Sequence, residues 1–119
     1  MGASMRISDR REGHVTIVDM AGRFSVVTTP GRLKDRIGGL ITGGCRHIVL
    51  NLADVSYIDS SGLGELVACY LMAQRQGCTI KLANLDGRMK DVLVLTRLLS
   101  LFESHPSERE AVRSFVSAA

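Results

Sequence analysis

The stretch Ile48–Leu71, IVLNLADVSYIDSSGLGELVACYL, decides the fold of this chain. The apolar run at 48–52 predicts a strand, and apolar residues at helical spacing after residue 62 predict a helix. Between them lie an acid, two serines and two glycines: Asp59, Ser60, Ser61, Gly62 and Gly64. A helix start offers free backbone N–H groups and the positive end of its dipole, so this junction suits an anion. That anion is a bound ligand, a reaction intermediate or a phosphate made on a serine.

The composition is that of one globular domain. With 119 residues, 45% hydrophobic and 23% charged, the chain can build one core but not two. We assign residues 1–119 to a single domain, with 1–4 as a disordered start or a cloning remnant. Aromatic residues make up only 4%, and the net charge of +3 is scattered, as in Lys34 followed by Asp35. These features argue against a nucleic-acid surface.

The chain also lacks sequence signals for membranes, secretion and metals. Its longest apolar run is too short to span a bilayer, and no signal peptide is evident. The cysteines are odd in number and lack C-x-x-C spacing; they are Cys45, Cys69 and Cys78. We expect all of them to be reduced and structural, as in a cytoplasmic protein. The histidines are isolated from one another, so no metal site is predicted; they are His14, His47 and His105.

Working outward from the central stretch, the patterns predict four strands and four helices. We expect strands at 5–11, 14–20, 47–52 and 79–83. We expect helices from about 30 to 42, from 61 to 76, from 87 to 95 with a possible continuation through 99, and from 107 onward. Strands separated by helices indicate right-handed crossovers and helices layered on a mixed sheet. The nearly continuous apolar run at 47–52 indicates a strand covered on both faces.

Three helix details are predicted from local chemistry. Thr29 and Pro30 suit the N-cap and first position of the first helix. Gly38 and Gly39 either let that helix approach a neighbour closely or let it fray. Ser107 and Glu110 form a capping box at the start of the last helix.

With this element order in view, residues 51–64, NLADVSYIDSSGLG, resemble the STAS domain, and most closely the bacterial anti-sigma-factor antagonists. The likeness covers almost the whole chain and is strongest at 59–64, with weaker support from Thr96-Arg97-Leu98. It implies an α/β, STAS-like fold with a four-stranded mixed sheet and about four helices, in the order β-β-α-β-α-β-α-α.

The resemblance also implies a function. In that family an anti-sigma factor that is also a serine kinase phosphorylates the first hydroxyl residue after the Asp, which here is Ser60. The unmodified antagonist binds the anti-sigma factor, and a PPM-type phosphatase resets the switch. ATP belongs to the kinase, so the resemblance implies no enzymatic activity and no cofactor. The expected partner-binding residues are Arg23, Ser25, Asp59, Ser60, Ser61, Gly62, Leu63 and Gly64.

One phrase departs from the family pattern. Gly22-Arg23-Phe24-Ser25 stands where the family usually has Gly-acid-Leu-Asp, so a serine replaces an acid and an arginine adds positive charge. This puts recognition by a typical kinase in doubt and favours a stable anion near Ser60. We expect Gly62 and Gly64 to keep side chains away, so that a partner's backbone can approach the hydroxyls. Leu63 is either an exposed anchor or a core residue, and its place in the apolar stripe favours the core.

Several alternatives stay open. The residues Asp59–Ser61 could simply cap a helix. A serine hydrolase is weakly supported, because G-x-S-x-G is absent and no base is evident. A phosphate-binding loop lacks its lysine. The main alternative is a STAS module that is never phosphorylated, either a scaffold of a signalling assembly or the small partner of a lipid-transport ATPase. The sequence is compatible with a monomer or a weak dimer.

Overall fold

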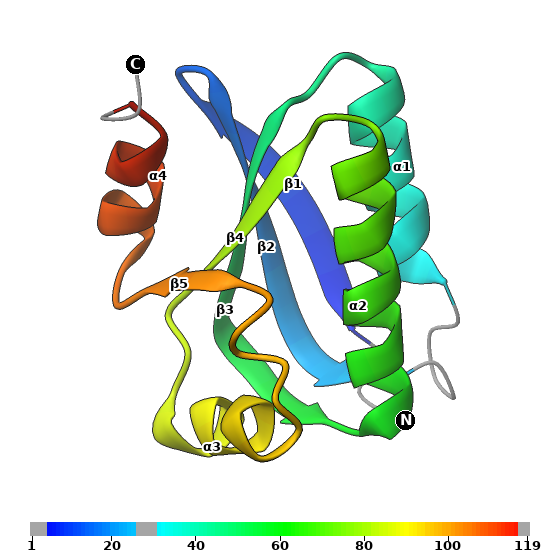
Figure 1. The fold of residues 1–119 in the computed structure, drawn as a ribbon, viewed down its shortest axis with the longest axis vertical. Coiled ribbons are helices and arrows are strands. Elements are labelled where there is room, and N and C mark those ends of the chain that lie inside the picture. The colour runs from blue at the N-terminus through cyan, green and yellow to red at the C-terminus, as the bar shows by residue number, and fades with distance from the viewer. Residues whose placement is uncertain (1–4, 26–30, 117–119) are drawn as a thin grey trace.

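The computed structural model describes residues 5–25 and 31–116, with side chains to residue 115. Figure 1 shows their arrangement as a sheet with helices on both faces. In chain order the elements are β1 (Arg6–Glu12), β2 (Val15–Phe24), α1 (Arg32–Thr42), β3 (His47–Ile58), α2 (Ser60–Arg75), β4 (Thr79–Ala83), α3 (Gly87–Leu95), β5 (Glu103–His105) and α4 (Glu108–Val116).

The strands form one mixed sheet in the order β1-β2-β3-β4-β5. The pair β1–β2 is antiparallel, and every other neighbouring pair is parallel. The α/β mixed sheet predicted from the sequence is confirmed, but it has five strands rather than four. The additional strand, β5, is three residues long and pairs Ser104 with Leu82 of β4. So short a strand leaves no periodic pattern in the sequence.

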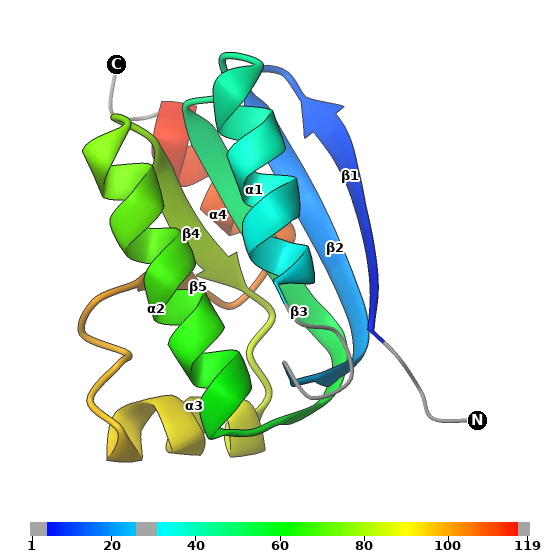
Figure 2. The same ribbon diagram turned by 90° about the vertical axis from the view of Figure 1, so that its right-hand side faces the viewer.

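The helices cover the two faces of the sheet unequally. Helices α1 and α2 lie on one face and α4 on the other, while α3 lies beyond the end of β3 (Figures 1 and 2). This layering explains the continuous apolar run in β3. Ile48 and Leu50 belong to the large cluster under α1 and α2, whereas Val49 joins the smaller cluster under α4. Alternate side chains of a strand point to opposite faces, so both faces need apolar residues.

The strand β3 is longer than predicted. It runs for 12 residues and carries Ala53–Ile58 beyond the expected end at Leu52. Its second half pairs with the end of β2, where two pairing shifts allow the strands to stay together. The central stretch therefore lies on a continuous strand until Ile58, and the turn into α2 is very short.

Helix ends agree with the sequence where the cap is local. Helix α3 spans 87–95 as predicted, but the continuation through 99 is wrong, because Arg97 has a φ of 62°. Ser107 Oγ accepts a hydrogen bond from Glu110 N at 3.1 Å, which confirms the cap of α4. Helix α1 begins after Gly31, later than expected, and Thr29 and Pro30 lie outside the described residues.

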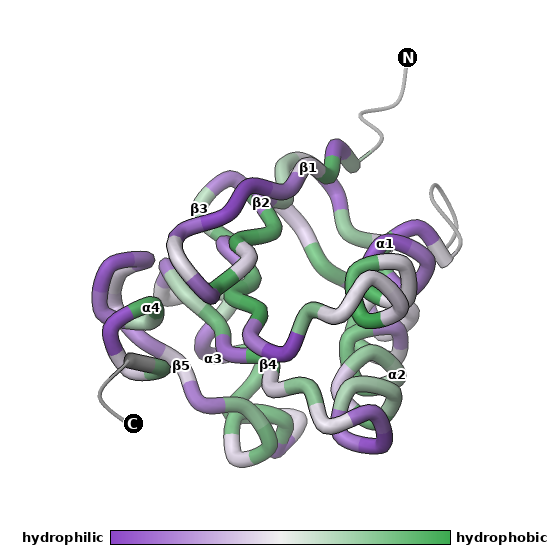
Figure 3. Tube along the Cα trace, turned by 90° about the horizontal axis from the view of Figure 1, so that it is seen from above, coloured by the Kyte–Doolittle hydropathy of each residue, from purple (hydrophilic) through white to green (hydrophobic). Residues whose placement is uncertain are grey.

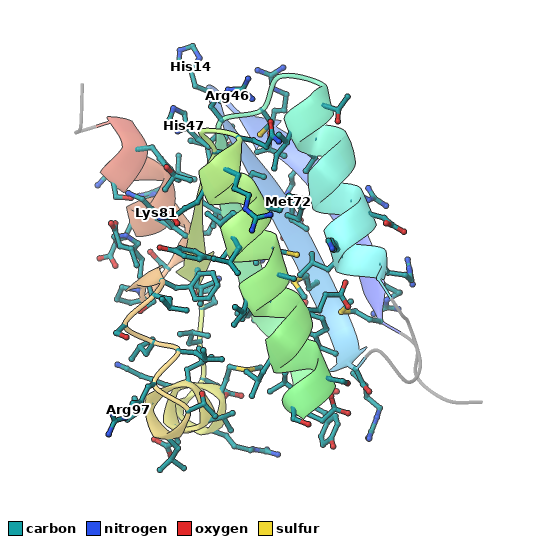
Figure 4. All side chains as sticks on the ribbon, turned by 45° about the vertical axis from the view of Figure 1, so that its right-hand side comes forward. His14, Arg46, His47, Met72, Lys81 and Arg97 are labelled. Carbon is teal, nitrogen blue, oxygen red and sulfur yellow. The ribbon has the colours of Figure 1, made fainter. Side chains whose placement is uncertain are left out.

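Gly38 lies where α1 faces α2. A methyl group there would meet Met72 Sδ at 3.8 Å, which is ordinary contact, and α1 continues through both glycines to Thr42. Neither expectation is borne out: α1 does not fray, and neither glycine is needed for a close approach, because Gly39 has nothing within 4 Å of its Cβ position. Figure 4 shows Met72 on α2 beside α1.

The edge strand β1 is held by two arginines of α1. Arg36 donates to Asp9 Oδ1 at 2.5 Å and to the carbonyl of Ile7 at 3.1 Å. Arg32 donates to the carbonyl of Met5 at 2.5 Å. The strand is mostly exposed and hydrophilic, as the hydropathy colouring shows (Figure 3).

The cysteines are free thiols, as predicted. Cys69 and Cys78 are buried and Cys45 is partly buried. Burial raises the pKa of the Cys69 thiol to about 12, so it stays protonated. Within the described residues, no helix has the length and apolarity that crossing a membrane requires.

Candidate functional site

The junction between β3 and α2 is organised by the side chain of Asp59. This residue is the N-cap of α2, and its Oδ1 accepts a hydrogen bond from Gly62 N at 3.0 Å. The same oxygen accepts a hydrogen bond from Ser61 Oγ at 2.5 Å. A carboxylate at this place satisfies an otherwise unpaired N–H group and interacts favourably with the helix dipole.

These hydrogen bonds keep Asp59 ionised. Donation from the Ser61 hydroxyl, then from the Ser25 hydroxyl and the Gly62 N–H, lowers the pKa of Asp59 to about 2. Hydrogen bonds to the charged form favour it over the protonated form. The site therefore carries one fixed negative charge directly beside Ser60.

Ser25 occupies the position where the family resemblance suggests an acid. It is buried at the end of β2, and its Oγ lies 3.3 Å from Ser61 Oγ. The structure thus brings Ser25, Asp59 and Ser61 into one hydrogen-bonded group. A second carboxylate at position 25 would lie close to Asp59, and like charges would oppose each other there.

Gly62 allows α2 to begin against the end of β2. A Cβ on this residue would lie 2.3 Å from the carbonyl oxygen of Phe24 and 3.1 Å from Ile58 Cγ1. The glycine is therefore needed for contact inside the protein. The open space expected at both glycines is absent at Gly62 and present at Gly64, which is exposed with nothing near its Cβ position.

Ser60 is the exposed hydroxyl of the group. It is the first residue of α2, and no hydrogen bond of its side chain to another residue of 5–25 or 31–115 occurs. Its neighbour Ser61 is partly buried and bonded to Asp59. Of the two adjacent serines, Ser60 is the more exposed.

Arg23 lies on the same edge of the sheet. It pairs with Tyr57 across β2 and β3, and its guanidinium carbon is 4.2 Å from the centre of the Tyr57 ring. Both side chains are exposed, Tyr57 to 41%. A cation over an aromatic face is attracted by the ring quadrupole, so the arginine is held at the end of β3 next to the junction.

The predicted partner-binding residues thus fall into three groups. Arg23, Ser60 and Gly64 are exposed, and Asp59 and Ser61 are partly buried. Ser25, Gly62 and Leu63 are buried, which confirms Leu63 as a core residue. The buried members shape the junction from within, and the exposed members form its surface.

Two features of the site were missed in the sequence. A groove of about 210 Å³ runs between the end of β3 and α3, next to the junction; its lining residues include Ser56, Tyr57, Asp86, Arg88 and Val92. Tyr57 was not predicted as a site residue, although an aromatic residue in a chain with so few of them is a usable signal. The position of α3 opposite β3 had no signal in the sequence.

The role of Glu65 was also not predicted from the sequence. It is buried on α2, and its Oε2 accepts a hydrogen bond from the backbone N of Lys34 in the first turn of α1 at 2.9 Å. Helix α1 has no side-chain cap of its own. Glu65 therefore caps a neighbouring helix, a role that sequence spacing cannot reveal.

The histidines lie elsewhere in the described structure. His14 and His47 are at the opposite end of the molecule from Ser60 (Figure 4), and His105 is hydrogen-bonded to Glu103 at 2.6 Å. No group of three or more potential metal-ligating residues occurs within the described ranges. The arrangement does not supply Ser60 with the histidine base that a serine hydrolase uses.

Comparison with known proteins agrees with this geometry. The STAS domain family model matches residues 6–111. The anti-sigma-B factor antagonist of Bacillus subtilis (strain 168) is 34% identical over 86 residues, which cover 72% of this chain and 77% of that protein.

Solved structures show the same fold. An anti-sigma factor antagonist from Mycobacterium paratuberculosis has a TM-score of 0.82 at 22% identity, covering 96% of this chain and 97% of that one. SpoIIAA of Bacillus in its phosphorylated form has a TM-score of 0.69 at 18% identity, covering 92% and 99%. The chain therefore belongs to the STAS domain family, and within it to the anti-sigma-factor antagonists.

Proposed function

We propose that this protein is a partner-switching antagonist whose switch is the phosphorylation of Ser60. With Ser60 unmodified it binds an anti-sigma factor that is also a serine kinase, and phosphorylation releases it. The observation that carries this proposal is the exposure of Ser60 at the first position of α2, beside a neighbouring serine whose hydroxyl is already bonded to Asp59.

The proposed modification is simple phosphoryl transfer. The partner kinase moves the γ-phosphoryl group of ATP to Ser60 Oγ, which loses its proton, and ADP is released. ATP belongs to the kinase, and this chain acts as substrate and ligand without an activity or cofactor of its own. A PPM-type phosphatase in the cytoplasm hydrolyses the phosphate and resets the switch.

The physical effect of the phosphate is local. It adds about −1.5 to −2 charges at neutral pH. The start of α2 tolerates an anion, because the helix dipole is positive there. A partner surface docked on Ser60 and the ionised Asp59 would instead meet a cluster of negative charge and lose affinity. The switch thus needs no change of fold.

Arg23 gives the phosphate a counter-charge on this protein. Its guanidinium is exposed at the end of β2, held over Tyr57 beside the junction. Arginine pairs well with phosphate because its N–H groups match the phosphate oxygens. We expect the phosphorylated form to be stabilised in part by this residue.

The test is incubation of the full chain with its cognate anti-sigma factor kinase and ATP, followed by mass spectrometry. We expect one phosphate on wild type, one on the Ser56→Ala control, and none on Ser60→Ala. A phosphate on Ser60→Ala would show that the site is wrong. If the wild type binds the partner without gaining phosphate, the switch is contradicted and the protein is a docking scaffold instead.

A further inference from the structure

A second cavity lies at the other end of the molecule from Ser60. It is enclosed by the β1–β2 hairpin, the end of α1 and the start of β3, and its volume is about 500 Å³. We call it the hairpin pocket. The pocket lies at the start of β3, whereas Ser60 follows the end of this 12-residue strand. It is not part of the proposed phosphorylation surface.

Basic side chains from separate segments converge on the hairpin pocket. They are Arg11 and His14 from the hairpin and Arg46 from the segment before β3; His47 also lines the pocket, but its ring packs on Phe115 of α4, with the ring centroids 4.7 Å apart. Figure 4 shows His14, Arg46 and His47 gathered at this end of the molecule. One acid, Asp9, also lines the pocket, and its carboxylate is engaged by Arg36 at 2.5 Å. The cavity therefore has an excess of positive charge.

The two arginines are not neutralised by acids of the described structure. None of the ion pairs among residues 5–25 and 31–115 includes Arg11 or Arg46. Arg46 Nη1 donates to the carbonyl of Cys45 at 2.9 Å, which steadies the side chain and leaves its other N–H groups for a ligand.

The end of α1 would oppose an anion if its carbonyls were free, because a helix C-terminus is the negative end of the dipole. Three carbonyl oxygens in the last turn of α1 are occupied. They accept hydrogen bonds at 2.9 to 3.0 Å from the backbone N atoms of the residues that follow; the pairs are Gly39 with Gly43, Ile41 with Gly44, and Leu40 with Cys45. The side chains rather than these carbonyls therefore decide the charge of the pocket.

A hydroxyl group adds a neutral donor. Thr16 lines the pocket and is only 6% exposed, and its Oγ1 accepts a hydrogen bond from Cys45 Sγ at 3.3 Å. Because the hydroxyl accepts from the thiol, its own proton remains for donation.

We propose that the hairpin pocket binds a phosphate-bearing small molecule. Arg11 and Arg46 bind the phosphate oxygens, and Thr16 supplies a further hydrogen bond. Two guanidinium groups match the charge of a phosphate dianion and its fork-like acceptor geometry. The volume is also within the range of small-molecule sites. The protein then has a ligand input at one end of β3 and a partner surface at the other.

The test is a titration of the full chain with inorganic pyrophosphate at constant ionic strength, followed by ¹H–¹⁵N NMR. We expect saturable shifts of the amides at 43–47 and smaller shifts at 59–64. Arg46→Gln and Arg11→Gln should each weaken binding by about tenfold or more, because each removes a charge-assisted hydrogen bond. Arg97→Gln, at an exposed arginine just after α3 and far from the pocket (Figure 4), is the matched control and should not change the affinity.

Two results would overturn the proposal. One is the absence of saturable shifts with millimolar pyrophosphate. The other is an equal loss of affinity in Arg97→Gln, which would indicate a non-specific effect of charge over the whole surface. All of these arginines are exposed, so the variants should keep the wild-type fold, and the spectra report this directly. Neither result bears on Ser60, whose phosphorylation is measured separately.

Discussion

Helices α1 and α2 cover the same face of the sheet, but their first turns are held in different ways. Helix α2 has a local cap, since Asp59 accepts hydrogen bonds from the Gly62 N–H and the Ser61 hydroxyl. Helix α1 begins after Gly31 and has no side-chain cap of its own. Its Lys34 N–H donates a hydrogen bond to the carboxylate of Glu65 on α2 instead. The difference separates two tasks. The local cap presents Ser60 to solvent, and the borrowed cap fastens α1 to the helix that carries Ser60.

The largest loss of stability is expected from disrupting the contact between the start of α2 and the end of β2. Gly62→Ala places a methyl group 2.3 Å from the Phe24 carbonyl oxygen. Backbone on both sides must move, so we expect a loss of about 3 kcal/mol in the free energy of unfolding and a fall in Tm of roughly 10 °C. Thermal and urea unfolding measure it. Gly64→Ala is the control; it is exposed with open space around it, and it should be neutral or slightly stabilising.

The next effect tests the borrowed cap. Glu65→Ala removes the acceptor for Lys34 N and leaves a small cavity. We expect a loss of about 2 kcal/mol in urea unfolding. Glu65→Gln keeps an acceptor oxygen and should recover most of that loss. If the glutamine variant is as unstable as the alanine variant, the charge of Glu65 matters rather than its hydrogen bond to α1.

A smaller effect concerns the local cap and depends on pH. The folded protein holds the pKa of Asp59 at about 2, below the value of about 3.9 for an unfolded chain. Its contribution to stability is therefore full above about pH 4 and is lost as the pH falls through 2. Asp59→Asn keeps an acceptor but does not titrate. In acid titrations followed by circular dichroism, its stability should fall less steeply between these pH values than that of wild type.

The smallest effect on stability is expected at Ser60. Ser60→Asp adds a negative charge to an exposed position at the positive end of α2, so the free energy of unfolding should change by less than about 0.5 kcal/mol. Its binding to the anti-sigma factor should weaken at least tenfold in calorimetry if phosphorylation acts through charge. A large loss of stability would instead assign Ser60 a structural role.

The sequence predicts the parts of the site that depend on neighbours in the chain. The apolar run of β3, the acid before α2 and the stripe that buries Leu63 are all local patterns, and each is confirmed. The two-sided burial of β3 also follows from its sequence, since Leu50 and Val49 face different clusters.

The remaining features depend on contacts between distant segments. The bond between Ser25 and Ser61, the approach of Gly62 to Phe24 and the reach of Glu65 to Lys34 each join different elements. Residue spacing does not predict such contacts. A glycine that makes room for a partner also cannot be distinguished in the sequence from one that allows close packing in the core. The strand β5 escapes prediction because its three polar residues form no apolar pattern, and the ion pair of Glu103 with Lys81 of β4 joins distant segments.

The arginines of α1 that reach β1 have a consequence for self-association. An uncovered edge strand is a template on which another chain can add its own strand and begin an aggregate. Here the carbonyls of Met5 and Ile7, two residues apart and so on one side of the strand, already accept from Arg32 and Arg36. An incoming strand would have to displace both guanidinium groups and cover a charged surface. Arg32 and Arg36 thus oppose the addition of a strand from another molecule to the β1 edge.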